Sequence, residues 1–134
     1  VFWRLLAHAA EYLKDYDVEI VEAHHSAKKD APSGTALKAA RIIAERKGLS
    51  EESFVFGRKG FSPRSSTEIG IHAVRAGDIV GEHTVIFARS GERIEITHRA
   101  HSREAFARGA VLAVKWVCKK QESGIYSMED VLWG

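Results

Sequence analysis

Cysteine and long apolar runs are scarce in this chain. Cys118 is the only cysteine among 134 residues, so no internal disulfide can form and a reducing, cytoplasmic setting is expected. Its apolar helical surroundings predict a buried, unreactive thiol. The longest apolar stretches, such as residues 110–114, fall far short of the roughly 18 to 20 residues that a membrane-spanning helix needs, and no signal segment opens the chain.

The excess of charge is also small. Lys and Arg number 20 and Asp and Glu 18, which gives a formal net charge of +2. The basic residues are scattered among the acids, and this does not fit a protein that binds nucleic acid. With 45% hydrophobic residues over 134 positions, we expect one ordinary domain, residues 1–134, with its own core.

The first half of the chain predicts two helices around a strand. Residues 1–13 carry apolar side chains every three or four positions, with no initiating Met or capping residue before them. This predicts a helix entered partway along, so we expect that an N-terminal segment has been removed. Residues 17–23 alternate polar and apolar side chains, which predicts a half-buried strand. Ser33 is then placed to cap a helix over 34–47 that stops at Gly48.

The second half predicts a sheet followed by a helix. Residues 51–66 are charged and aperiodic, which indicates a surface loop. Three strand-like segments separated by short turns follow, at 67–74, 79–89 and 92–99. They predict an antiparallel meander that the first strand joins. A long helix over 103–120 is expected to cover the sheet. The expected class is α+β, a mostly antiparallel or mixed open sheet with helices packed on one face.

Segment 22–36 gathers several groups that attract anions. It holds two adjacent imidazoles, two ammonium groups and the expected helix start. Backbone N–H groups at a helix N-terminus bind carboxylate or phosphate, and Ser33, Gly34 and Thr35 add hydroxyl donors and close access to the backbone. Lys28 lies four residues past the first imidazole. It is placed to neutralise an acidic substrate and lend it a proton if burial depresses its pKa.

Spacing alone also leaves a purely structural interpretation open. In that interpretation Ser33 is only a helix cap, the histidine pair ends a strand in solvent, and the lysines keep a loop hydrated. A zinc site at His24 and His25 is disfavoured. Adjacent residues on an extended chain point opposite ways, and no Cys or carboxylate stands at a recognised metal spacing. We therefore expect no metal.

Four ordered segments of the chain resemble one enzyme family. Glu22-Ala-His-His, with Lys28 and the run Asp-Ala-Pro-Ser-Gly-Thr-Ala that ends at Ala36, resembles the signature of 4-hydroxy-tetrahydrodipicolinate reductases, also called dihydrodipicolinate reductases. The other three segments resemble the family's later strands and final helix, and they span 74–84, 91–98 and 102–110. The resemblance identifies the chain as the C-terminal substrate-binding domain of such an enzyme.

The resemblance implies a reductase of lysine and diaminopimelate biosynthesis. It implies hydride transfer from NADPH or NADH to a cyclic imine dicarboxylate. His24 and Lys28 would be the catalytic residues of the proton-transfer steps, and His25 would contact the substrate. The residues implied at a substrate carboxylate are Ser33, Gly34 and Thr35. Arg103 matches another basic residue near the family's pocket, whereas Ser26-Ala27 replaces more basic residues of some relatives.

The resemblance also implies what lies outside the chain. The family's enzymes begin with a Rossmann unit, and no G-x-G-x-x-G pattern occurs in these 134 residues. The nicotinamide cofactor would therefore bind to an absent N-terminal domain, and this piece alone would be inactive. Family members are homotetramers built through the sheet. Two alternatives stay open: a non-catalytic tetramerisation module, and a related domain of another small-acid dehydrogenase.

Overall fold

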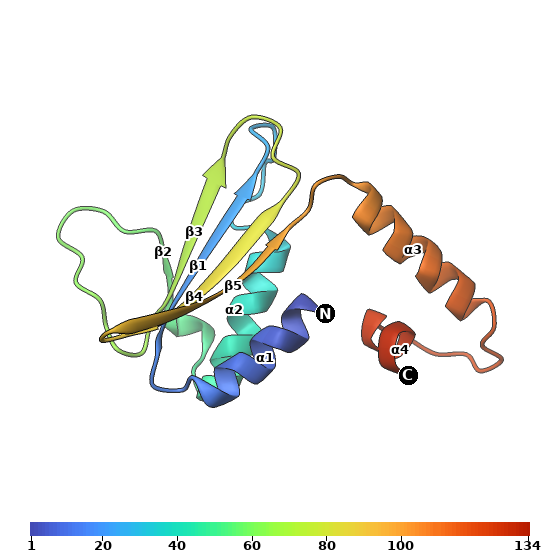
Figure 1. The fold of residues 1–134 in the computed structure, drawn as a ribbon, viewed down its shortest axis with the longest axis horizontal. Coiled ribbons are helices and arrows are strands. Elements are labelled where there is room, and N and C mark those ends of the chain that lie inside the picture. Colours follow the sequence, from blue (N-terminus) through green and yellow to red (C-terminus); the bar gives the residue numbers. More distant parts are fainter. The chain divides into compact units, whose positions relative to one another are not determined.

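The computed structural model describes residues 1–134, which divide into two compact units, Val1–Arg99 and Ala100–Gly134. The first unit contains α1 (Phe2–Tyr12), β1 (Asp17–His24), α2 (Gly34–Lys47), the short 3-10 helix η1 (Glu51–Ser53), β2 (Phe54–Phe56), β3 (Ile69–Arg75), β4 (Glu82–Arg89) and β5 (Glu92–Arg99) (Figure 1). The second contains α3 (Glu104–Val117) and α4 (Met128–Trp133). No helix combines the length and apolar character needed to cross a bilayer.

The five strands form one mixed sheet in the order β2-β3-β1-β4-β5, so the expected α+β class is confirmed. β1 pairs in parallel with β3 and antiparallel with β4, and β4 pairs antiparallel with β5. The predicted meander is wrong at one point, because β1 lies between β3 and β4 (Figure 1). Its central place gives β1 two pairing partners and lets Val18 and Ile20 be buried, and no local pattern reveals which strands those partners are.

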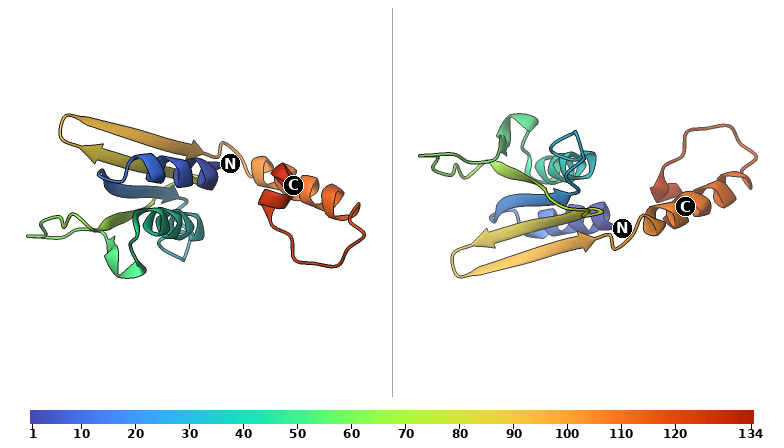
Figure 2. Two further views of the ribbon diagram at one scale, coloured as in Figure 1. Left: turned by 90° about the horizontal axis from the view of Figure 1, so that it is seen from below. Right: turned by 90° about the horizontal axis from the view of Figure 1, so that it is seen from above.

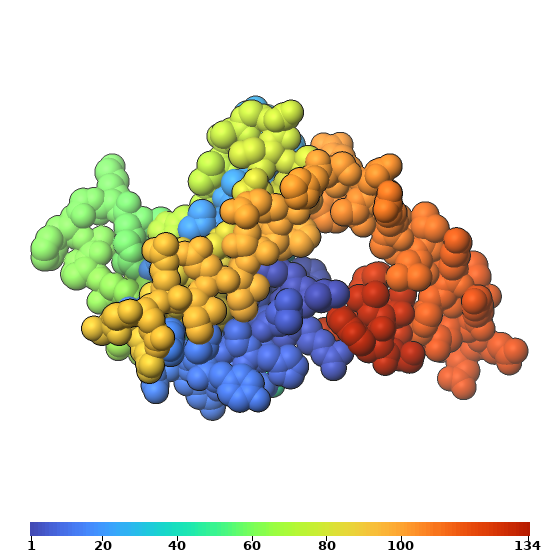
Figure 3. Space-filling model, viewed as in Figure 1, coloured from blue at the N-terminus to red at the C-terminus, as the bar shows by residue number.

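The loop expected over 51–66 contains ordered structure. Besides η1, the three residues of β2 pair in parallel with residues 69–71 of β3. Such a short strand shows no periodicity, which is why the pattern failed to predict it. Residues 57–68 form neither helix nor strand, and this segment projects from the β2 edge of the sheet (green in Figure 3).

Two helices cover one face of the sheet. Figure 2 shows α1 and α2 on the same side of the strands, and their apolar faces share one cluster with the strands. Its larger buried members are Leu6, Ile20, Ile43, Ile69, Ile71, Val85 and Phe87. α2 contributes mainly alanines, which lets its backbone approach the strands closely. The opposite face of the sheet carries partly exposed side chains such as Glu19, Val21 and His72.

The caps of α2 confirm the sequence prediction. The Ser33 hydroxyl oxygen accepts a hydrogen bond from the Ala36 N–H at 3.2 Å, which satisfies one of the helix's free donors. Gly48 ends the helix in the left-handed region with φ 69°, where a Cβ would be strained. The start of α2 is therefore fixed in space, and the site described below depends on it.

The second unit is small and open. Residue 103 precedes α3, and the Ser102 hydroxyl oxygen accepts from the Glu104 N–H at 3.3 Å. None of the residues of α3 is buried, and Cys118 is exposed, so the expected burial of its thiol is wrong. A unit of this length cannot enclose a core of its own. The covering of the sheet described above comes from α1 and α2.

Candidate functional site

A buried carboxylate joins the end of β1 to the start of α2. Glu22 lies on the helix-covered face of β1, in phase with Val18 and Ile20, and is 0% exposed. Its two oxygens accept hydrogen bonds from both terminal nitrogens of Arg75, each at 2.8 Å, and from the Ser33 N–H at 2.9 Å. A buried charge needs such partners.

The Glu22 carboxyl stays ionised in this setting. Burial by itself raises its pKa, but hydrogen bonds from Arg75, His24 and the Ser33 amide together hold the pKa below its ordinary value. The same pairing raises the pKa of Arg75. Arg75 stands opposite His24 in the β1–β3 register and also donates to the Asp30 carbonyl at 2.6 Å, so the pair fixes both ends of the loop between β1 and α2.

His24 is held in one orientation. Its Nδ1 lies 2.6 Å from Glu22 Oε2. Because an ionised carboxylate can only accept a hydrogen bond, Nδ1 carries the proton. Nε2 is then the ring nitrogen that can accept a hydrogen bond or a proton. The backbone of His24 is held as well, because its carbonyl accepts a hydrogen bond from the Ala76 N–H at 3.0 Å. This bond brings the turn between β3 and β4 close to His24.

A second imidazole, His83 of β4, supports Ser33 from within the core. It is 6% exposed, its Nε2 lies 2.9 Å from the Ser33 hydroxyl oxygen, and its ring meets that of His24 edge-on with centroids 5.1 Å apart. Burial, followed by the positive charges of His24 and other neighbours, lowers the pKa of His83 from 6.5 to about 4. His83 is therefore neutral near pH 7.

The bonding of Ser33 leaves its hydroxyl proton free. His83 Nδ1 is buried without a partner, and a buried bare lone pair costs less than a buried unpaired N–H. The proton of the neutral His83 ring is thus best placed on Nε2, where it donates to Ser33. The Ser33 oxygen then accepts twice, once from His83 and once from Ala36. Its own O–H remains available as a donor.

The remaining predicted residues lie in the first turn of α2 and in the loop before it. The N–H groups of Gly34 and Thr35, in the first turn of α2, donate to no partner within the chain. Lys28 pairs with Asp30 at 2.7 Å, and its charge contributes to lowering the pKa of His83. His25 is partly exposed in the loop that follows β1. The segment thus presents imidazole, ammonium, hydroxyl and amide donors around the start of one helix.

Three functional candidates were missed or left without a role by the sequence patterns. Glu22 stands in the family-like motif without a predicted role, and Arg75 and His83 are not among the predicted site residues. Glu22 carried a signal, because a carboxylate in phase with buried apolar residues requires a cationic partner. Its partners could not be named without the sheet order. Arg103, expected near the pocket, belongs to the second unit.

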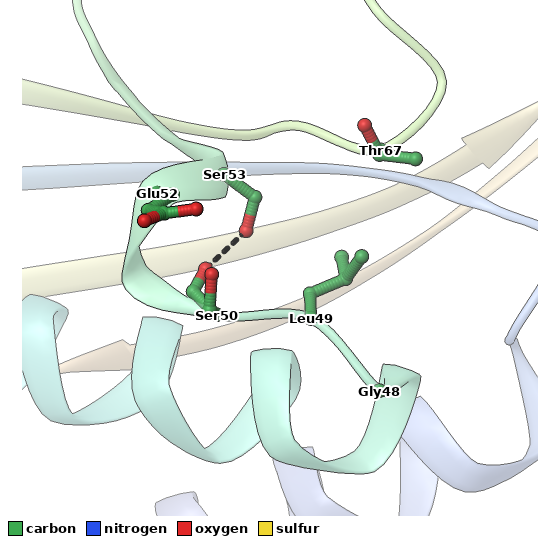
Figure 4. Close-up of a pocket in the computed structure, with 6 residues that line it drawn as sticks. All are labelled: Gly48, Leu49, Ser50, Glu52, Ser53 and Thr67. Carbon is green, nitrogen blue, oxygen red and sulfur yellow. Dashed lines mark hydrogen bonds between the residues drawn. The ribbon is translucent and has the colours of Figure 1, made fainter.

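Two surface hollows differ in their chemistry. One of about 490 Å³ lies at the far end of α2 and is lined by Gly48, Leu49, Ser50, Glu52, Ser53 and Thr67 (Figure 4). It offers one carboxylate and no cation, so it does not fit an anionic ligand. A hollow of about 260 Å³ at the start of α2 is lined by Val1, Phe2, Trp3, Thr35 and His98. Its aromatic walls suit a flat ring.

Comparisons with known proteins point to one enzyme family. The family model described as "Dihydrodipicolinate reductase, C-terminus" matches residues 1–132. A 4-hydroxy-tetrahydrodipicolinate reductase of Methanosarcina acetivorans is 62% identical over 132 residues, 98% of this chain and 49% of that protein. The Methanocaldococcus jannaschii enzyme of the same name is 56% identical over 133 residues, 98% of this chain and 48% of that protein.

A solved structure matches as well. The dipicolinate-bound dihydrodipicolinate reductase from Paenisporosarcina sp. TG-14 has a TM-score of 0.71 and 29% sequence identity, covering 98% of this chain and 49% of that one. The chain therefore spans about half the length of the curated relatives it matches.

Proposed function

Because this chain belongs to the dihydrodipicolinate reductase C-terminal family, we propose that it is the substrate-binding domain of a 4-hydroxy-tetrahydrodipicolinate reductase. The enzyme would be a cytoplasmic, NADPH- or NADH-dependent oxidoreductase of lysine and diaminopimelate biosynthesis. Its substrate would be a cyclic imine dicarboxylate. The observation that carries the proposal is the set of free donors at the start of α2, which hydrogen bonds link through Ser33 and Glu22 to His24.

One substrate carboxylate would bind at the start of α2. The free N–H groups of Gly34 and Thr35 and the hydroxyl proton of Ser33 supply three donors in one region, and the helix dipole favours negative charge there. His25 and Lys28 would contact the rest of the ring. In this proposal the substrate competes with Asp30 for Lys28, since the pair is only a surface ion pair in the free chain.

The chain's own part in the chemistry would be proton transfer. Reduction of an unsaturated ring places negative charge on it, and a positioned acid accelerates the step that removes this charge. We assign that role to His24 and Lys28. Glu22 contacts both the His24 ring and the Ser33 N–H, and the charge of Lys28 reaches His83, the partner of Ser33.

The dinucleotide would be held elsewhere. The β1–α2 connection, which joins a strand to a helix, lacks a glycine-rich turn, and its final residues before α2 are Ala31, Pro32 and Ser33. It therefore does not fit the pyrophosphate of NADPH or NADH. We propose an additional N-terminal domain for the cofactor, and a homotetramer assembled through the uncovered face of the sheet, which exposes Val74.

Turnover by the full-length protein tests the proposal. Lys28→Ala should lower kcat by about 100-fold, on the order of what a positioned general acid contributes, when oxidation of NADPH or NADH is followed by absorbance. The exposed neighbour Lys29 is a matched control, and Lys29→Ala should keep turnover within about 3-fold of the wild type, because a surface charge contributes little. If Lys28→Ala also keeps full turnover, the domain is an assembly module rather than a catalytic one.

A further inference from the structure

We propose that Glu22 is a positioning residue that selects the tautomer of His24 and aims its Nε2 at the substrate. The inference rests on the proposed function, since it assigns Glu22 a part in the same reaction. It also concerns a property of the free chain, namely which ring nitrogen of His24 carries the proton. That property can be measured without turnover.

The contact between Glu22 and His24 supports the proposal first. Glu22 is fully buried and stays ionised, and its Oε2 lies 2.6 Å from His24 Nδ1. Since the carboxylate has no proton to give, the bond exists only while Nδ1 is protonated. A neutral His24 therefore carries its proton on Nδ1, and Nε2 is the nitrogen that gains and releases a proton during turnover.

Arg75 makes this arrangement stable inside the protein. Its two terminal nitrogens grip both oxygens of Glu22 at 2.8 Å, so the carboxylate cannot rotate away from the ring. The guanidinium also balances the carboxylate charge, so the pair is buried as a neutral unit. Arg75 thereby fixes Glu22, and Glu22 fixes His24.

Gly81 is an independent observation in support of the proposal, because the absence of a side chain there leaves space next to His24 Nε2. Gly81 is buried in the turn before β4, and a Cβ built there would lie 3.1 Å from His24 Nε2 and 3.4 Å from its Cδ2. Its φ is not in the left-handed region, so backbone strain does not explain the glycine. A side chain at this position would press on the nitrogen that the proposal leaves free.

Glu19 provides a matched control on the same strand. It lies on the opposite face of β1, and its carboxylate also meets an imidazole, with Oε2 2.6 Å from His72 Nε2, and a guanidinium, with Oε1 3.1 Å from Arg58. Burial alone raises the pKa of this carboxyl, but its partners, His72 first, hold the pKa below the ordinary value. Glu19→Gln thus removes an equivalent network that does not touch His24.

The test combines ring-nitrogen NMR with kinetics. In the ¹⁵N-labelled chain above the pKa of an ordinary histidine, the wild type and Glu19→Gln should show His24 protonated on Nδ1. In Glu22→Gln the side-chain amide can donate to Nδ1, so a large share of His24 should move its proton to Nε2. In the full-length protein, Glu22→Gln should lower kcat by about 10- to 100-fold while the substrate KM changes by less than about 3-fold. Glu19→Gln is the control for the NMR measurement alone.

A second variant covers the case in which Glu22→Gln fails to fold. Gly81→Ala leaves Glu22 and Arg75 untouched, but its Cβ would lie 3.1 Å from His24 Nε2. It should displace that nitrogen, keep the proton on Nδ1 and lower kcat by about 10-fold. Gly109→Ala is its control, because Gly109 lies in a helix with nothing within 4 Å of the added Cβ. This variant should leave kcat unchanged. An unchanged His24 tautomer and unchanged kcat in a folded Glu22→Gln, or an unchanged kcat in Gly81→Ala, would overturn the proposal.

Failure of the proposed function looks different. If the wild-type full-length protein does not reduce the imine dicarboxylate, the proposed function is wrong. The proposed role of Glu22 in that reaction is then wrong as well. If the wild type turns over but Glu22→Gln keeps both the tautomer and kcat, only the positioning role is wrong.

Discussion

Acidification should destabilise the first unit through one buried imidazole. His83 has a folded-state pKa of about 4 against an ordinary value of 6.5. Between these values the unfolded chain binds a proton that the folded chain does not, so the free energy of unfolding falls as pH falls through this window. The loss is small at pH 7 and complete below about pH 4. From pH 7 to pH 5 this group alone removes about 2 kcal/mol.

Charged groups around His83 also influence its protonation. The carboxyl pKa of Glu22 lies below its ordinary value, so its stabilising bonds are lost only at lower pH. Positive charge on His24, His98 and Lys28 lowers the pKa of His83, whereas the negative charge of Glu22 raises it. Protonation would place an N–H on His83 Nδ1, which is buried without a partner, while the Nε2–H bond to Ser33 would be kept.

Urea unfolding of the wild type and of His83→Gln at pH 7 and pH 5 measures the effect. The wild type should lose about 2 kcal/mol more than the variant over this interval. His8→Gln is a suitable control, because it removes a histidine that is exposed on α1, and it should keep the wild-type pH dependence. Equal pH dependence in the wild type and His83→Gln would show that His83 is not held neutral by burial, and would refute the reasoning.

Three further substitutions test the local structure. Ser33→Ala removes the N-cap of α2 and should lower the free energy of unfolding by about 1 to 2 kcal/mol, as measured by urea unfolding. Gly48→Ala forces a Cβ into a φ of 69° and should cost about 1 kcal/mol in the same assay. Gly70→Ala would place a Cβ against the Glu19 carboxylate, so it should release that side chain from His72 and lower the melting temperature. Unchanged stability in any of these variants would contradict the corresponding contact.

Local patterns predicted the elements better than their arrangement. The bounds of α2 followed from Ser33 and Gly48, because caps are encoded by the residues that form them. The alternation over 17–23 predicted β1 for the same reason. The pairing of β1 with β3 and β4 did not follow, because it depends on contacts between residues far apart in the chain, and the three residues of β2 are too few to form a pattern.

The site divides in the same way. The residues proposed to face the ligand lie within one segment, and the helix-terminus chemistry of Ser33 and Gly34 follows from neighbouring positions. The residues that hold them in position by hydrogen bonds come from other strands. Arg75 and His83 reach Glu22 and Ser33 only because β1 lies between β3 and β4. No sequence window contains both members of these pairs.

The central claim is that the start of α2 binds a carboxylate of a flat cyclic diacid. Titrating the ¹⁵N-labelled chain with pyridine-2,6-dicarboxylate, and following the amides of Gly34 and Thr35 and the ring of His25, tests it most directly. The account predicts saturable shifts at these three residues that pyridine without carboxylates does not produce. Amide and ring signals that stay unmoved at millimolar dicarboxylate would contradict it.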